Sequence, residues 1–420
     1  MISIIQRYIY EHIDDWPVEV RQSRHLLPLL RSNINYNFVE NYPLITRVIF
    51  WFGEGDNYPS LVSKIMDKSI KLESIKRCIT FQEGLNKKMG YPLYPRIFDI
   101  AEISGNIILF EEVVKKSTYE TELKRAICGP ERSLAHLERV IRRQFNEMGG
   151  LFRQLQDMPT SDKPRQWGEW AYKLGQDFRD TSGFGTNFLS DAHLERMRRA
   201  INSVPLPQTP VIADLVCPNI FPGPRLIDNI IPDIDELNAQ LPGVINVFRF
   251  MVTYFYSPPI SEIFKDWLYA LIVAITDKEG QTIIGPPVRG ILSQVGLEPD
   301  RSEVIWAFVM AATFFEMKDK LEFYRESPFM IGGKKGEFRQ WTNRLVGIQK
   351  FIGSNKSFDP KPVIWAQDSL RTQEPPALSF NLFKKAILSL FPSFMRPALI
   401  KLYRKFYPKF STILYLRKGR

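Results

Sequence analysis

The stretch "IADLVCPNIFPGPRLIDN", residues 212–229, places an aspartate, an asparagine and a second aspartate between short apolar runs. These polar residues are Asp214, Asn219 and Asp228. Asp and Asn are common in turns because their side chains bond to nearby backbone groups, so the pattern taken alone favours a surface turn. Carboxylate and amide oxygens are also the ligands that Mg²⁺ prefers, which makes the same residues compatible with a phosphoryl-transfer site. Other parts of the sequence must decide between a surface turn and a phosphoryl-transfer site.

The net charge of the chain, +10 over 420 residues, is not evenly spread. Residues 380–420 contain ten Lys or Arg and no Asp or Glu. Removing those ten leaves 46 Lys and Arg against 46 Asp and Glu in residues 1–379, so the body is formally neutral. A nucleic-acid-binding body usually carries its own basic face. The sequence therefore predicts no nucleic-acid partner for the body.

The chain has the composition of a globular protein, with 44% hydrophobic and 24% charged residues, and is long enough for two domains or lobes. Its cysteines, Cys78, Cys128 and Cys217, are far apart, which predicts free thiols and a cytoplasmic setting. Cys217 is expected to be buried and inert. Four scattered histidines argue against a zinc site.

The apolar runs 267–276 and 304–315 are shorter than the ~20 residues that span a bilayer, and they predict core helices.

The first 115 residues predict a small antiparallel sheet with one helix inserted after its third strand. Runs of β-branched and aromatic residues predict strands at 46–55, 60–66, 94–103 and 107–114, and the helix is expected near 69–89. From Tyr119 onward, apolar spacing predicts mainly helices, most clearly over 133–156 and 244–350, with the opening stretch as two short strands around "PGP". The expected parts are a lead-in at 1–30, a β-rich lobe at 31–115, a helical lobe at 116–350, a linker at 351–379 and a basic tail at 380–420.

This α+β order of elements is similar to that of the protein-kinase-like fold, with a small β-rich N-lobe and a larger, mainly helical C-lobe. Phosphoryl transfer from ATP depends mostly on positioning and charge neutralisation. The protein-kinase signature supplies a strand lysine, a helix glutamate, Asp-x-x-x-x-Asn and a later Asp, in that order. Here Lys64 in "LVSKIM" and Glu83 in "ITFQEGLNKKM" precede the opening stretch.

The opening stretch itself resembles the aminoglycoside phosphotransferase and choline kinase group of small-molecule kinases. That group carries a pattern like "HGDLxPxNIL" followed by "LID", and this chain has "IADLVCPNIF" followed by "RLIDN". The stretch "NIILFEEVV", residues 106–114, is similar to the hinge strand of the group. The resemblance covers about residues 40–330, and only the opening stretch has motif-level similarity.

The resemblance implies an ATP- and Mg²⁺-dependent kinase that phosphorylates a hydroxyl of a small molecule: a sugar, an amino-alcohol or a glycan- or lipid-linked group. Asp214 would be the catalytic base that deprotonates the hydroxyl. Asn219 and Asp228 would be the Mg²⁺ ligands. The resemblance does not identify the acceptor, because one fold hosts many substrates.

The resemblance also assigns the nucleotide contacts. Lys64, paired with Glu83, would contact the α- and β-phosphates of ATP. Backbone groups near Glu111 and Val113 would meet the adenine. Each of these residues also has an ordinary structural interpretation, since a strand lysine or a helix glutamate is most often a solvated surface charge.

The chain departs from the pattern of the group at the residues before the base. Ile212 stands where the group has the histidine that braces the catalytic loop, and Ala213 replaces a glycine. No glycine-rich loop precedes Lys64, and the "PGP" turn is short. These departures leave open a pseudokinase, which is a binding or scaffold protein with the same fold. A membrane-associated interaction protein unrelated to kinases is a third hypothesis.

The basic tail is the second feature with a functional implication. In "FNLFKKAILSLFPSF", residues 380–394, apolar side chains fall on one helical face beside Lys384 and Lys385. Basic, aromatic-rich amphipathic helices bind anionic membrane surfaces. The tail predicts peripheral association with the inner face of a membrane, and the alternative is docking onto the body of the protein or onto a partner.

Overall fold

The computed structural model describes the chain in segments that cover most of residues 2–372. They are residues 2–16, 36–41, 45–50, 61–66, 68, 70–114, 116–129, 133–158, 165–183, 189–212, 215–223, 227, 241–264, 266–323, 341–342, 346 and 360–372. Asp214, Asp228 and the basic tail lie outside these segments.

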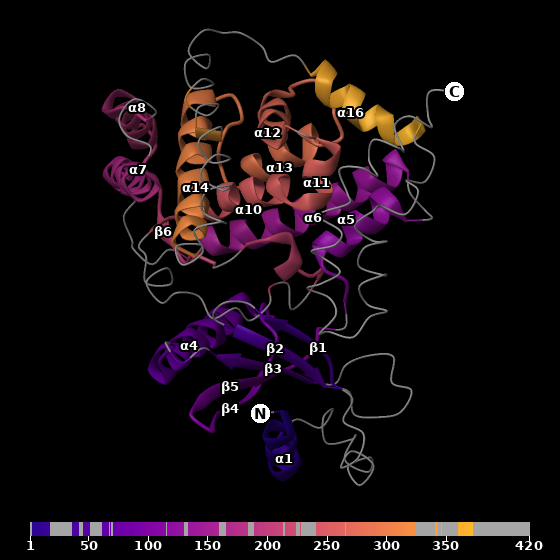
Figure 1. The fold of residues 1–420 in the computed structure, drawn as a ribbon. Helices are drawn as coiled ribbons and strands as arrows, with labels where there is room; N and C mark the ends of the chain where they lie inside the picture. Colours follow the sequence, from indigo (N-terminus) through magenta and orange to yellow (C-terminus); the bar gives the residue numbers. More distant parts are fainter. Residues whose placement is uncertain are drawn as a thin grey trace, which may run out of the picture. The chain divides into compact units, whose positions relative to one another are not determined.

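The first part of the chain forms one five-stranded antiparallel sheet (Figure 1), with strand order β1-β2-β3-β5-β4. The strands are β1 (Tyr36–Asn41), β2 (Ile45–Phe50), β3 (Leu61–Met66), β4 (Ile97–Ile103) and β5 (Asn106–Glu111). Helix α4 (Leu72–Met89) follows β3 and corresponds to the helix predicted near residues 69–89. The predicted strands are longer than the observed ones, and β1 was not predicted.

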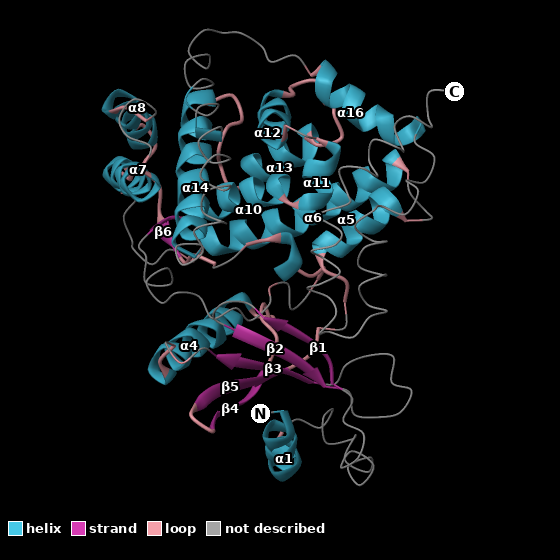
Figure 2. Ribbon diagram, viewed as in Figure 1, coloured by secondary structure: helices cyan, strands magenta, loops and turns pink. Residues whose placement is uncertain are grey.

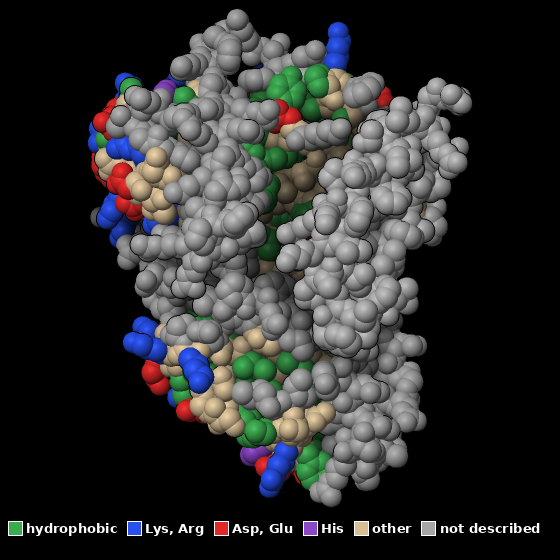
Figure 3. Space-filling model, viewed as in Figure 1, with side chains coloured by type: hydrophobic (Ala, Val, Ile, Leu, Met, Phe, Trp, Pro, Cys, Tyr) green, Lys and Arg blue, Asp and Glu red, His purple; other side chains and the backbone are tan. Residues whose placement is uncertain are grey.

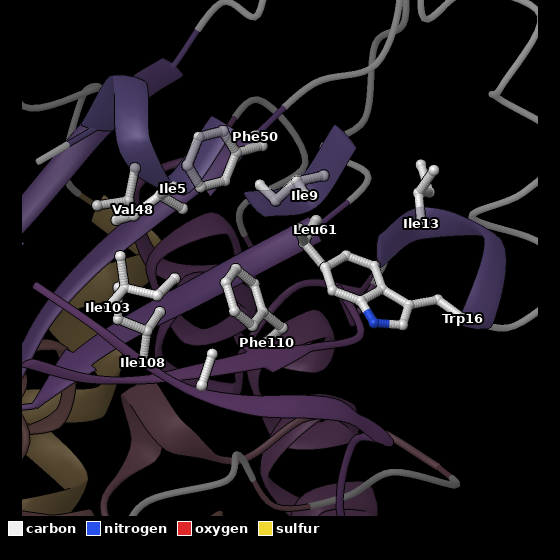
Figure 4. Close-up of a cluster of buried hydrophobic side chains, with 11 residues drawn as sticks. Ile5, Ile9, Ile13, Trp16, Val48, Phe50, Leu61, Ile103, Ile108 and Phe110 are labelled. Carbon is white, nitrogen blue, oxygen red and sulfur yellow. The ribbon is translucent and has the colours of Figure 1, made fainter. Parts of the chain in front are cut away.

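The two faces of this sheet are covered by different helices. On one face lies α1 (Ile2–His12), followed by the short helix η1 (Ile13–Asp15). Figure 4 shows Ile5 and Ile9 of α1 directed toward Phe50 and Phe110 of the sheet, in one buried cluster. Their spacing of four residues places them on one side of the helix. The segment expected as a lead-in therefore contributes to the core of the sheet.

The opposite face packs against α4. Met66 of β3 and Leu109 of β5 form a second buried cluster with Ile75 of α4. Successive side chains of a strand alternate between the faces, so Lys64, two residues before Met66, lies on this α4 side of the sheet.

The remainder of the described chain is mainly helical (Figure 2). Its helices are α5 (Tyr119–Cys128), α6 (Leu134–Gln156), α7 (Gly168–Ser182), α8 (Asp191–Asn202), α10 (Ile245–Tyr256), α11 (Pro258–Ile263), α12 (Trp267–Thr276), α13 (Gly285–Gln294), α14 (Ser302–Phe323) and α16 (Lys361–Thr372). A short pair, β6 (Gln208–Thr209) and β7 (Leu241–Pro242), and the helix η3 (Cys217–Asn219) complete it. The predicted α+β class, with a small antiparallel sheet and a larger helical part, is confirmed.

Helix α10 lies in the core of the helical part. Every residue from Ile245 to Phe255 is buried, which is the pattern of a helix surrounded on all sides by protein. Prolines lie in the first turn of the neighbouring helices α11 and α13, where a missing N–H has no intrahelical partner to lose. Within its described residues, the opening stretch forms an antiparallel bridge between Ile220 and Ile227, on either side of the "PGP" turn.

The apolar runs expected as core helices are found in α12 and α14, and both are buried. No helix within the described segments is long and apolar enough to cross a membrane.

The surface over α7 and α8 carries both signs of charge (Figure 3), with Arg179 beside Asp191 and Arg198 beside Glu169.

Helix α16 lies within the segment expected as a linker. Its Val363 and Gln367 are buried, and the Gln367 Oε1 accepts a hydrogen bond of 3.1 Å from the amide of Ile283. Polar composition suggested a linker, but these contacts with the body stabilise a helix there.

Candidate functional site

The segment before Asp214 is held by a polar side chain of the buried helix α10. Asn246, which is fully buried, accepts a hydrogen bond of 3.1 Å from the amide of Ile212. Its Nδ2 donates to the carbonyl of Pro210 at 2.9 Å. One amide side chain therefore satisfies two backbone groups of the segment.

Arg249, about one turn along the same helix, binds the carbonyl of Ile212. Its Nη1 donates to the carbonyl of Ile212 at 3.2 Å, and its Nε donates to Glu316 Oε1 of α14 at 2.7 Å. The guanidinium also lies 4.4 Å from the ring centre of Phe315. Arg249 is 1% exposed and Glu316 is 7% exposed, so both charges are removed from water and stabilised by this pairing.

Thr253 holds the segment after Asp214. Its hydroxyl donates to the carbonyl of Leu215 at 2.5 Å. Asn246, Arg249 and Thr253 are spaced by three and four residues, which places them on one face of α10. The described backbone on both sides of Asp214 is thus fixed to a buried helix. Asp214 itself lies outside the described residues.

Asn219 ends the helix η3 and is half-buried. Its amide donates to the carbonyl of Val216 at 2.9 Å, and the following carbonyl, of Ile220, accepts from Tyr119 at the start of α5. These bonds fix the turn that carries the predicted Mg²⁺ ligand.

Cys217, at the start of η3, is a buried thiol, as predicted. Burial raises the pKa of Cys217 to about 12, despite a hydrogen bond with Ser257 that acts in the opposite direction. A thiol with this pKa is protonated at neutral pH and is a poor nucleophile.

Lys64 is buried on the α4 side of β3 and forms an ion pair with Glu111. Lys64 Nζ lies 2.7 Å from Glu111 Oε1, and both side chains are 2% exposed. In the strand register Lys64 faces Leu109 and Val62 faces Glu111, so the two charged residues are diagonal neighbours on one face. The sheet itself supplies a carboxylate partner for the lysine.

The predicted pairing of Lys64 with Glu83 is therefore wrong. Glu83 lies on α4, as expected, but its side chain is exposed. The buried residues of α4 include Cys78, Gln82 and Leu85, which repeat at helical spacing. One residue on from Gln82, Glu83 is turned by about 100° around the helix axis and faces away from the sheet.

The residues expected at the hinge lie at the end of β5 and directly after it. Glu111 is the last residue of the strand, and the next amide, of Glu112, donates to the carbonyl of Arg96 at 2.9 Å. Val113 is half-buried. A contact of this backbone with adenine remains a prediction, as does Mg²⁺ binding by Asn219 and Asp228.

No group of three or more His, Cys, Asp or Glu side chains able to hold a metal ion occurs among the described residues. Asp214 and Asp228 are not among the described residues, so this statement does not cover them.

Comparison with known proteins adds little to these observations. No protein-family model matches the chain, and no curated protein matches it. A solved structure titled "Glucosamine kinase (crystal form B)" is similar with a TM-score of 0.41 and 11% sequence identity, over 76% of this chain and 83% of that chain. A likeness at this level does not establish the activity of the chain.

The role of the polar residues of α10 was not predicted from the sequence. The sequence predicts helices over residues 244–350, and α10 lies in that range with every residue from Ile245 to Phe255 buried. The available signal was the spacing of Asn246, Arg249 and Thr253 in an otherwise apolar helix, since polar side chains buried at helical spacing need partners.

Proposed function

We propose that the chain is an ATP- and Mg²⁺-dependent phosphotransferase that acts on a hydroxyl of a small molecule, with a two-lobed, protein-kinase-like fold. The observation that carries the proposal is the fixation of the backbone on both sides of Asp214 by buried polar side chains of α10. A solvated turn needs no buried arginine beneath it, whereas a catalytic carboxylate must be held close to its productive geometry.

In this proposal Asp214 accepts the proton of the attacking hydroxyl. Asn219 and Asp228 hold Mg²⁺, which supplies charge neutralisation at the phosphates when it is bound. The half-buried position of Asn219 on a short, hydrogen-bonded helix supports this role, because it limits the movement of the side chain. The proposed acceptor of the phosphoryl group is a sugar, an amino-alcohol or a glycan- or lipid-linked group.

Lys64 supplies the positive charge for the α- and β-phosphates, with Glu111 rather than Glu83 as its carboxylate. The ion pair at 2.7 Å supports a lysine held in one position. The backbone that leaves β5 near Val113 is proposed to meet the adenine.

A pseudokinase is the second candidate, and the burial of Lys64 favours it. The lysine is 1% exposed, so a phosphate could reach the ammonium group only if the atoms that cover it moved. In this case the fold would serve as a binding or scaffold module without turnover.

Turnover of ATP distinguishes an active phosphotransferase from a pseudokinase. The wild-type protein is expected to release ADP from Mg-ATP in the presence of at least one member of a panel of sugars and amino-alcohols. Asp214→Asn is expected to reduce that rate by about 100-fold or more, because a positioned base contributes roughly 10²–10⁴-fold. Thermal stabilisation by Mg-ATP should persist in the variant. Stabilisation without turnover in the wild type would support the pseudokinase, and absence of both would contradict the nucleotide site.

We further propose that the basic tail holds the protein at the inner face of an anionic membrane. Each Lys or Arg near such a surface contributes about 1 kcal/mol, and residues 380–420 carry ten of them. Deletion of 380–420 is expected to abolish co-sedimentation with phosphatidylserine-containing vesicles, while vesicles of phosphatidylcholine alone should bind neither form. Equal sedimentation of the full-length and shortened proteins would contradict the proposal.

A further inference from the structure

We infer that Asn246, Arg249 and Thr253 are positioning residues for the reaction proposed above, because they hold the described backbone just before and just after Asp214. The inference rests on the proposed function. None of the three is assigned a contact with substrate or nucleotide, and each acts through hydrogen bonds to the segment before or after the base.

The hydrogen bonds from α10 to the segment around Asp214 reach backbone atoms. Asn246 binds the amide of Ile212 and the carbonyl of Pro210, while Arg249 binds the carbonyl of Ile212. Both polar backbone groups of Ile212 are thereby satisfied, and its side chain is fully buried. The histidine that braces this loop in the resembling kinases is absent here, and α10 supplies a brace that does not depend on the side chain at position 212.

The guanidinium of Arg249 connects the loop to a second helix. Its Nε is held by Glu316 of α14 while its Nη1 holds the loop. Because the guanidinium is planar and its donors have fixed directions, fixing one edge also fixes the other. The loop is therefore coupled to α10 and α14 together.

Thr253 offers the sharpest test, because its hydroxyl can be removed with little change in shape. The hydroxyl has one proton, and the carbonyl of Leu215 at 2.5 Å is nearer than the carbonyl of Arg249, at 2.9 Å, in the same helix. Thr253→Val removes the bond to the loop, and Thr253→Ser retains a hydroxyl. Thr313 of α14 is a matched control: it is also buried, and its hydroxyl donates to the carbonyl of Val309 in its own helix.

The expected result is a fall in kcat of about 10- to 100-fold for Thr253→Val with the KM for ATP unchanged, since small misplacements of catalytic groups reduce rates on this scale. Thr253→Ser should restore kcat to within about threefold. Thr313→Val should retain the wild-type kcat, although it loses a buried hydroxyl of the same kind. Amide hydrogen exchange of residues 208–216 should be faster in Thr253→Val than in Thr313→Val.

Wild-type kcat in Thr253→Val, or equal losses in the Thr253→Val and Thr313→Val variants, would overturn the positioning role while leaving the proposed function intact. A wild-type protein that turns over no ATP would remove the proposed function, and the positioning role with it. Faster exchange of residues 208–216 together with a selective loss of kcat supports the inference.

Discussion

Replacing Lys64 by methionine is expected to lower the free energy of unfolding by about 3–5 kcal/mol. The substitution leaves the carboxylate of Glu111, which is 2% exposed, without the ammonium group that lies 2.7 Å away. Removing one partner of a buried ion pair has an effect of this size because the remaining charge keeps its desolvation penalty. Urea unfolding of the variant and the wild type measures the difference.

The double variant Lys64→Met/Glu111→Leu should recover most of this loss, because an apolar pair removes both buried charges. Lys124→Met is the matched control. Lys124 and Glu120 on α5 also lie 2.7 Å apart, but the Lys124 side chain is 57% exposed. Its replacement should change the stability by no more than about 0.5 kcal/mol. Equal effects of Lys64→Met and Lys124→Met would show that Lys64 is not buried as described.

Replacing Arg249 by methionine is expected to lower the free energy of unfolding by a similar amount, about 3–5 kcal/mol. Here the double variant Arg249→Met/Glu316→Leu should recover only part of the loss. The carbonyl of Ile212 would still lack the donor that lies 3.2 Å away in the wild type, and a buried group left without its hydrogen bond costs about 1–3 kcal/mol. Urea unfolding of the single and double variants measures both quantities.

A surface arginine provides the comparison for this second prediction. Arg198 of α8 lies 2.7 Å from Glu195 and 2.6 Å from Glu169, in positions open to solvent. Arg198→Met should therefore change the stability by about 1 kcal/mol or less. If Arg249→Met/Glu316→Leu were as stable as the wild type, the hydrogen bond from Arg249 to the carbonyl of Ile212 would not contribute to the free energy of unfolding.

The order of elements could be predicted because its signals are local. The runs around Lys64 and Phe110 are β-branched and aromatic, and turn residues separate them. Strand β1, "YNFVEN", has a weaker pattern, and its place in the sheet depends on pairing with β2. Helix α16 was missed for a related reason, since its stabilising contacts come from residues distant in the sequence.

The candidate site could be predicted only in part. The motif identifies Asp214 and Asn219, but it cannot say which carboxylate meets Lys64. That choice depends on the register of β3 with β5 and on the rotation of α4, where buried Gln82 and exposed Glu83 are adjacent in the sequence. The bonds from α10 to the loop join residues 34 to 38 positions apart, a separation at which a local pattern carries no information.

The packing of α1 on the sheet has a consequence for synthesis. Tyr8 donates a hydrogen bond to Asp99 and stacks on Phe110, so its partners lie about ninety or more residues downstream. At about 5–20 residues per second, the ribosome needs roughly 5–20 s to deliver them. During that interval Ile5, Ile9 and Trp16 have no sheet to cover. Helix α1 is therefore synthesised before the strands that bury it, and nascent chains expose its apolar face until β4 and β5 have been made.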